Sequence, residues 1–411
     1  MSPAQDASAG QLTRREFVQA AGASGALALT GPLSSSGAVA EQKIPPATGP
    51  ATELPTRILG KTGLRVSVIG YGSYNLSNPR LLDAAISQGV TLVETAADYQ
   101  NGRAEETIGQ VMARRRKQVV LGTGKECTPT MTVQEVLREI DRSLQRLQTD
   151  YLDLWRVHYV SDAKVLRNEA IYEAFDRAKR AGKVGHLGVS THSSPATGEV
   201  VQTAIAAKRF EFLMSKYNFM EFPEDYVPFK NAVDAGMGVI VFKIGAGKRD
   251  DELADLQRRL KVTGEQAKIK WALRNANVTA ILSGARSFES IREACEATRS
   301  PLSQAERRYL DAYAERFKRE YCRYCGRCVA ACPYGVQVDA VMRFAMYFTY
   351  YGAEKAAMQE YAALPARARA EPCGRCEGPC MRACPNGVRV QPQLAEAHRL
   401  LTLEEGTRHH A

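Results

Sequence analysis

The stretch Thr91–Gly109, TLVETAADYQNGRAEETIG, is the part of the sequence that best indicates the fold. Its apolar start predicts a short strand over Thr91–Thr95, and Glu94 and Tyr99 lie at the strand end and in the loop after it. The pair Glu105–Glu106 then begins a predicted helix, where carboxylates interact favourably with the positive N-terminus. A strand whose polar end runs directly into a helix is how α/β barrels build active sites. The structural alternatives are an acid that caps the helix and a tyrosine that only packs.

The same alternation of strand and helix continues from Thr56 to about residue 300. Amphipathic helical patterns, such as Thr132–Leu147 and Glu265–Arg274, separate the apolar strands. Eight such units in about 245 residues match the size of a (β/α)8 TIM barrel, so the predicted class is α/β. Gly70-Tyr71-Gly72 lacks the third glycine of a dinucleotide fingerprint, which disfavours a doubly wound sheet. The expected strands are Val66–Gly72, Leu92–Ala96, Val119–Gly124, Leu152–His158, Val184–Ser190, Phe210–Asn218, Gly238–Lys243 and Thr279–Ala285.

Polar residues follow successive strands at the end where barrel enzymes carry their chemistry. Lys125 follows the third expected strand and His158 ends the fourth. A lysine ammonium beside Tyr99 would lower the pKa of the phenol and make it a usable proton donor. We expect Glu94 to pair with Lys125 and fix it, and His158 to hydrogen-bond a substrate carbonyl. Each residue alone is more often structural, but four at neighbouring strand ends indicate a catalytic group.

With these residues in place, the chain resembles the aldo-keto reductase superfamily. The likeness covers roughly residues 56–300 and keeps the order of the elements. The matching segments are TRILGKTGLRVSVIGYGS (56–73), VETAADYQNGRAEETIG (93–109), TGKE around Lys125, YLDLWRVH (151–158), KVGHLGVS (183–190) and EQAKIKWALRNANVTAILSGARSFESIREA (265–294).

The resemblance implies a barrel that binds NADP(H) or NAD(H) and transfers hydride between nicotinamide and a small-molecule carbonyl or alcohol. It makes Tyr99 the general acid, Lys125 the modulator of its pKa, and His158 the group that orients the substrate. Glu94 becomes the partner of Lys125. The cofactor contacts it implies are Gly72, Ser73, Ser190, Thr191, Met214, Phe242, Lys243, Gly284, Arg286, Ser287 and Glu293.

Several positions depart from the family pattern. The family usually has Asp where Glu94 stands, Asn where Thr191 stands and Gln where Met214 stands. A hydroxyl and a thioether offer fewer hydrogen bonds than two amides. Ala294 also stands where an Asn is frequent. These changes leave open an alternative function, an electron-transfer or binding protein whose barrel no longer performs hydride transfer.

Eight of the ten cysteines lie between residues 322 and 384, in two motifs. The first, C-x2-C-x2-C-x3-C-P, has the spacing of bacterial ferredoxin ligands, and the second is one residue longer in the middle. Because the cysteine before proline reaches the other cluster in two-cluster ferredoxins, the spacing predicts two interleaved [4Fe–4S] sites. One site would use Cys322, Cys325, Cys328 and Cys384, and the other Cys373, Cys376, Cys380 and Cys332.

Two Zn(Cys)4 sites, or disulfides in an exported protein, are the alternatives to iron–sulfur clusters. Zinc ribbons favour two distant C-x-x-C pairs, whereas here four cysteines lie within eleven residues and precede a proline. The intervening segment, Val341–Ala363, has a helical composition, so residues 322–400 resemble an α-helical two-cluster ferredoxin. A connecting helical region, residues 301–321, is expected to join it to the barrel.

The N-terminal residues 1–40 have the pattern of a twin-arginine export signal. Arg14-Arg15 precedes a mild apolar run, Ala20–Leu29, and Ala38-Val39-Ala40 offers a cleavage site. Residues 41–55 have the composition of a linker. We therefore expect a periplasmic protein handled by the twin-arginine export machinery. Two roles are open for the clusters, electron exchange with a redox partner protein or structural support.

The formal net charge is +10, but this value counts every cysteine as neutral. Thiolates bound to metal would make the protein less basic, so the charge does not require nucleic acid as a partner. The sequence contains no internal apolar stretch as long as a transmembrane helix needs, and we expect no stable membrane span.

Overall fold

The structure is a computed structural model, and it describes residues 54–192, 194–247 and 250–402. All of these residues belong to one compact unit, Ile44–Ala411. The predicted export signal lies outside the described residues, as does most of the predicted linker. No helix of the described part is long and apolar enough to cross a membrane.

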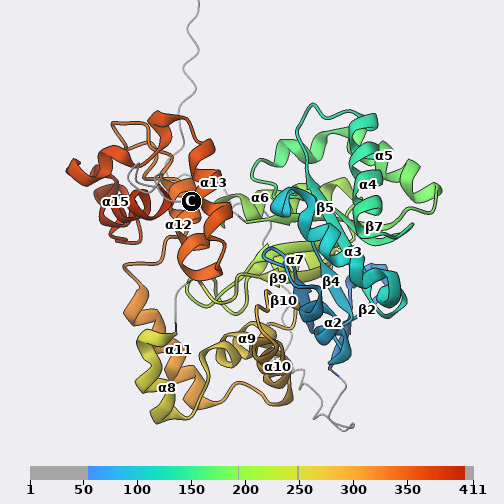
Figure 1. Ribbon diagram of the computed structural model, residues 1–411, viewed down its shortest axis with the longest axis horizontal. Helices are drawn as coiled ribbons and strands as arrows, with labels where there is room; N and C mark the ends of the chain where they lie inside the picture. Colours follow the sequence, from blue (N-terminus) through green and yellow to red (C-terminus); the bar gives the residue numbers. More distant parts are fainter. Residues whose placement is uncertain (1–53, 193, 248–249, 403–411) are drawn as a thin grey trace, which may run out of the picture. The chain divides into compact units, whose positions relative to one another are not determined.

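Eight parallel strands close into a barrel, in the order β10-β3-β4-β5-β6-β7-β8-β9 (Figure 1). This confirms the predicted α/β barrel. The closure brings every strand's carboxyl end to one mouth, which is why polar residues far apart in sequence can share a site. The barrel strands are β3 (Ile69–Gly72), β4 (Leu92–Glu94), β5 (Val120–Glu126), β6 (Leu152–His158), β7 (Val184–Thr191), β8 (Phe212–Lys216), β9 (Gly238–Phe242) and β10 (Ala280–Ser283).

The first expected strand, Val66–Gly72, is wrong in its first half. β1 (Thr56–Ile58) and β2 (Arg65–Ser67) pair antiparallel as a separate hairpin, and only β3 enters the barrel. The fully buried Leu59 and Val66 of this hairpin join the apolar cluster of the barrel interior. The sequence pattern did not reveal this break, because a hairpin that packs against the barrel interior buries the same residue types as a barrel strand.

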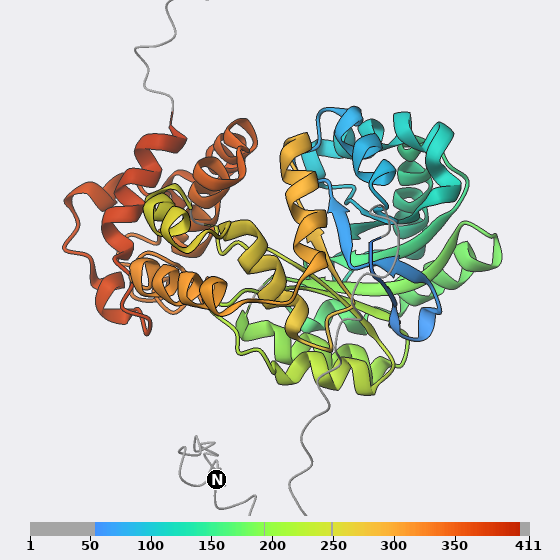
Figure 2. The ribbon, with the colours of Figure 1, turned by 90° about the horizontal axis from the view of Figure 1, so that it is seen from below.

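Helices surround the strands and bury their apolar faces in the largest core of the protein (Figure 2). α4 begins with a capping box, in which the Thr132 hydroxyl accepts from the Glu135 N–H and the Glu135 carboxylate accepts from the Thr132 N–H. The helices of this part are α2 (Pro79–Ser87), α3 (Arg103–Arg115), α4 (Val133–Leu147), α5 (Glu169–Arg180), α6 (Ser194–Ala207), α7 (Val227–Asp234), α8 (Ala254–Leu260), α9 (Gly264–Arg274), α10 (Phe288–Glu296) and α11 (Gln304–Phe317).

The C-terminal region is helical and has a hydrophobic core of its own, which includes Val336, Ala357 and Leu394 (orange to red in Figure 2). The segment expected to be helical, Val341–Ala363, contains two helices. Gly352, with φ of 61°, ends the first helix in the left-handed conformation that favours glycine. The helices are α12 (Val338–Tyr351), α13 (Glu354–Ala363), α14 (Pro379–Ala383) and α15 (Val390–Leu401).

Candidate active site and cluster-binding module

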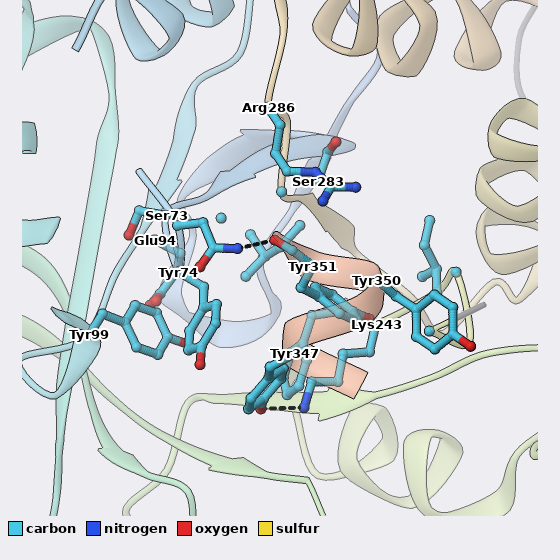
Figure 3. Close-up of a pocket in the computed structure, with 18 of the residues that line it drawn as sticks. Ser73, Tyr74, Glu94, Tyr99, Lys243, Ser283, Arg286, Tyr347, Tyr350 and Tyr351 are labelled. Atoms are coloured by element: carbon cyan, nitrogen blue, oxygen red, sulfur yellow. Dashed lines mark hydrogen bonds between the residues drawn. The ribbon is translucent and has the colours of Figure 1, made fainter. Parts of the chain in front are cut away.

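A cavity of about 640 Å³ opens at the carboxyl ends of the barrel strands (Figure 3). Glu94 at the end of β4 and His158 at the end of β6 line it, together with Tyr99 from the loop after β4. Helix α12 of the C-terminal region also contributes side chains to its wall. The cavity therefore contains three of the four predicted catalytic residues, while Lys125 is not among its lining residues.

Tyr99 and His158 lie together in this cavity. Their rings meet edge to face, with centroids 5.5 Å apart, and the ring of Tyr74 packs edge-on against Tyr99 at 5.1 Å (Figure 3). Burial raises the pKa of Tyr99, so the phenol is protonated at neutral pH. A protonated phenol beside an imidazole is an arrangement that can move a proton to or from a bound substrate.

Asp98 connects His158 and Lys125. Its carboxylate accepts a hydrogen bond from Lys125 Nζ, and Oδ2 lies 3.2 Å from Nδ1 of His158. Burial acts to raise the pKa of Asp98, but the hydrogen bonds from His158 and Lys125 outweigh it and hold this pKa well below its usual range. Because an ionised carboxylate only accepts, Nδ1 of His158 must carry a proton.

The expected pairing of Glu94 with Lys125 is therefore wrong. Lys125 pairs with Asp98, and within the described residues no hydrogen bond or ion pair joins it to Tyr99. Glu94 instead pairs with Arg156 of β6, and each of these two side chains is only 1% exposed. Burial raises the pKa of Glu94 to about 7, against the opposing charge of Arg156. The extra methylene of Glu94 carries its carboxylate to this neighbour in the barrel interior.

The residues expected to hold the nicotinamide cofactor fall into two groups. Ser190 and Thr191 are buried but do not line the cavity, and the Ser190 hydroxyl accepts from the Tyr159 N–H at 3.0 Å. Ser287 caps α10, and neither it nor Glu293 lines the cavity. The predicted residues that do line it are Gly72, Ser73, Met214, Phe242, Lys243, Gly284 and Arg286.

Several polar atoms around this cavity suit a dinucleotide. In the described structure, the Ser73 and Thr191 hydroxyls and Nε2 of His158 are buried without a hydrogen-bond partner. Such groups usually find partners in a protein or its ligand. Lys243 is partly buried, and within the described residues its ammonium hydrogen-bonds one group, the neutral Tyr347 hydroxyl, at 2.8 Å. The Lys243 ammonium and the Ser73 hydroxyl, which both line the cavity, fit the phosphates and the carboxamide of a nicotinamide dinucleotide.

Sequence analysis missed the contribution of α12. Arg343 contacts Tyr159 through a hydrogen bond to its hydroxyl and lies 5.2 Å from its ring centre. The backbone carbonyl of Tyr351 accepts from the Asn75 side chain (Figure 3). No sequence pattern links a helix between cysteine motifs to a barrel mouth, so this contact was not predictable. Asp98 and Arg156 were within reach, since each is a charged residue two or fewer positions from a predicted one.

Cysteines of the two motifs lie near one another. The thiols that act electrostatically on Cys373 are Cys332, Cys380 and Cys376, and those of the second motif that act on Cys328 are Cys380 and Cys384. Each motif's last cysteine thus lies with the other motif. Among the described residues, no three Cys, His, Asp or Glu side chains are close enough to hold a single metal ion. The spacing of the cysteines within each motif is what fits 4Fe–4S ligation.

Backbone amides also point at the thiols. The N–H groups of Tyr324, Gly378 and Val388 donate to the sulfurs of Cys322, Cys376 and Cys384, each at 3.4 Å. Hydrogen bonds to cluster sulfurs are one means by which a protein sets reduction potential.

Comparisons with known proteins agree with this architecture. Residues 69–247 match the aldo/keto reductase family. The barrel is an aldo-keto reductase domain. The Uncharacterized oxidoreductase YrpG of Bacillus subtilis (strain 168) is 28% identical over 310 residues, which are 62% of this chain and 94% of that protein. The Aldo-keto reductase YhdN of the same organism is 29% identical over 185 residues, 40% of this chain and 54% of that protein.

A solved structure shares the fold of the aldo-keto reductase domain. The holo form of aldo-keto reductase AKR11C1 from Bacillus halodurans superimposes with a TM-score of 0.53 at 22% identity, covering 63% of this chain and 96% of that one. Residues 316–337 match the 4Fe-4S binding domain. The chain is thus an NAD(P)-dependent oxidoreductase whose fold implies a nicotinamide cofactor and whose C-terminal region implies a 4Fe–4S cluster.

Proposed function

We propose that this protein interconverts a carbonyl and an alcohol with NADPH or NADH, and that Tyr99 is its general acid. The observation that carries the proposal is the edge-to-face pair of Tyr99 and His158, which both line the cavity of about 640 Å³. A bound nicotinamide would supply the hydride. Tyr99 would donate its phenolic proton to the carbonyl oxygen, and would take one back in alcohol oxidation.

We propose that His158 orients the substrate by accepting a hydrogen bond from it. Burial lowers its pKa to about 4, so the imidazole is neutral at pH 7. Because Nδ1 is committed to Asp98, the unpartnered Nε2 presents a lone pair to the cavity. This nitrogen would accept a hydrogen bond from the alcohol hydroxyl. Because Nε2 carries no proton, it can accept a hydrogen bond from an alcohol but cannot donate one to a carbonyl.

The test of the proposal is Tyr99→Phe in the cluster-loaded chain, with 4-nitrobenzaldehyde as probe and either coenzyme. We expect kcat to fall at least about 100-fold, because general acid catalysis contributes that much. Cofactor affinity, followed by nicotinamide fluorescence, should stay within a factor of about two. Tyr151→Phe, at the opposite end of the barrel strands, is the matched control and should leave kcat unchanged.

Wild-type turnover that survives in Tyr99→Phe would reject Tyr99 as proton donor. The absence of NADPH or NADH binding at micromolar concentration would instead favour the alternative function, an electron-transfer or binding protein. The displacement of Lys125 from the cavity is the observation that keeps this alternative in view.

We further propose that the C-terminal region holds two [4Fe–4S] clusters and that the protein is exported by the twin-arginine route to the periplasm. The interleaved cysteine sets support the count of two. The Arg14-Arg15 motif and the cleavage site after Ala40 support export. The mature N-terminus of protein purified from its host decides the second point, since a chain that still begins at Met1 contradicts export.

A further inference from the structure

Strand β5 turns its glycines toward the barrel interior. A Cβ atom on Gly122 would overlap the Glu94 carboxylate, and one on Gly124 would overlap the side chain and carbonyl of Arg156. Because alternate residues of a strand face opposite sides, Lys125 faces the other way. Lys125 therefore does not approach Tyr99 from the interior face of β5.

Arg156 occupies the space that these glycines leave. It lies directly opposite Gly124 in the register of β5 and β6, two residues before His158 on the same face. Its side chain is fully buried and its charge is balanced by Glu94. Nε of Arg156 and Oε1 of Glu94 have no hydrogen-bond partner within the described residues.

Two neighbours connect Arg156 to Tyr99. Its ion-pair partner Glu94 lines the cavity with Tyr99. His158, two residues further along β6, meets the ring of Tyr99 with the centroids 5.5 Å apart. The charge of Arg156 acts to lower the pKa of Tyr99, against the burial that raises it. Lys125 is half-buried and neutralised by Asp98.

We propose that Arg156, supplied by the neighbouring strand, is the cation beside Tyr99 whose role the family resemblance assigns to Lys125. The inference rests on the proposed function of Tyr99. Arg156 is a positioning residue, because it acts through Tyr99 and does not touch the reacting atoms. A guanidinium remains charged at every working pH, even when buried, whereas a buried lysine readily loses its proton. Arg156 therefore stays positive across the pH range in which its partner Glu94 titrates.

The kinetic test compares Arg156→Leu, Arg156→Lys and Lys125→Met in the cluster-loaded full chain, with 4-nitrobenzaldehyde as probe. We expect kcat to fall about 100-fold in Arg156→Leu with unchanged cofactor affinity. Arg156→Lys keeps a positive charge at this position, and its kcat should be at least about tenfold higher than that of Arg156→Leu. Lys125→Met should change kcat by less than about threefold. Equal losses in Arg156→Leu and Lys125→Met, or no loss in Arg156→Leu, would overturn the proposal.

A second measurement does not depend on turnover. Glu94→Gln leaves the Arg156 charge unbalanced, so the Tyr99 phenol should ionise at lower pH than in the wild type by about one pH unit or more. The phenolate absorbance of each protein is compared with that of the same protein carrying Tyr99→Phe, which isolates this tyrosine. A shift to lower pH in Glu94→Gln that is lost in the double variant Arg156→Leu/Glu94→Gln supports the proposal, and the double variant leaves no unbalanced charge in the barrel interior. An equal shift in both would overturn it, because Glu94 alone would then account for the change. An unchanged or higher ionisation range would overturn it, whether or not Tyr99 proves to be the proton donor.

Discussion

At the scale of single residues, one carboxylate determines how the site can work. Asp98 follows directly from the sequence AADY, yet its role depends on two partners that the strands β5 and β6 bring to it. Asp98 pairs with Lys125 and accepts a hydrogen bond from Nδ1 of His158. Under the proposal above, Arg156 is then the cation that acts on Tyr99. The identities of Tyr99 and His158 as site residues were predictable because they end strand units. The partners of these two residues were not predictable. The side to which a side chain points near a strand end depends on the strand register that barrel closure imposes.

Lys243 gives the site a dependence on pH. Burial lowers its pKa to about 7, so the ammonium is present below this pH and is lost above it. If Lys243 binds the dinucleotide phosphates, cofactor affinity should weaken by about tenfold between pH 6 and pH 8.5, because one lost charge contact is worth on the order of 1.4 kcal/mol. Fluorescence titration with NADH avoids ionisation of a 2′-phosphate. Lys243→Met should bind weakly with no such slope, and a persisting slope would assign the titration to another group.

At the scale of elements, α12 belongs to two sites at once. Its buried face packs in the core of the cluster-binding region, while Arg343 and Tyr347 reach residues of the barrel mouth. The helical character of this segment was predictable from its composition. Its position was not, because the contacts that place it are between residues more than 100 positions apart.

The contact of Arg343 with Tyr159 should control the substrate side of the cavity. Tyr159 follows His158 and has a φ of 55°, an uncommon conformation for a tyrosine that its surroundings must hold. Arg343→Met removes that restraint, so we expect kcat/KM for 4-nitrobenzaldehyde to change about three- to tenfold at constant cofactor affinity, on the order of 1 kcal/mol. Lys355→Met, an exposed change on α13, is the matched control. Equal effects of both variants would assign the change to general loosening of the region.

At the scale of the whole molecule, the chain combines a barrel with a cluster-binding region that could each be predicted from separate signals. Strand periodicity predicted the barrel, and cysteine spacing predicted the second region. The hairpin β1–β2 was not predicted because Leu59 and Val66 are buried in the same way as the apolar residues of barrel strands. What periodicity and spacing cannot reveal is which surfaces of two regions meet.

The interleaved cysteines lead to a prediction about cluster content. Cys384→Ser should remove the cluster of the first motif, and Cys332→Ser the cluster of the second, because each residue lies with the other motif. We expect each variant to retain about half of the wild-type iron and acid-labile sulfide. Cys295→Ser, a buried cysteine of α10 outside the motifs, should retain all of it. Retention of both clusters in Cys384→Ser would refute the interleaved assignment.

The long separation of Cys322 from Cys384 in the sequence bears on when the iron sites can be filled. A ribosome must synthesise both cysteine motifs before the ligand set that begins at Cys322 is complete. Under this assignment, neither site can be filled from the first motif alone. Iron loading therefore begins only after translation has passed the second motif.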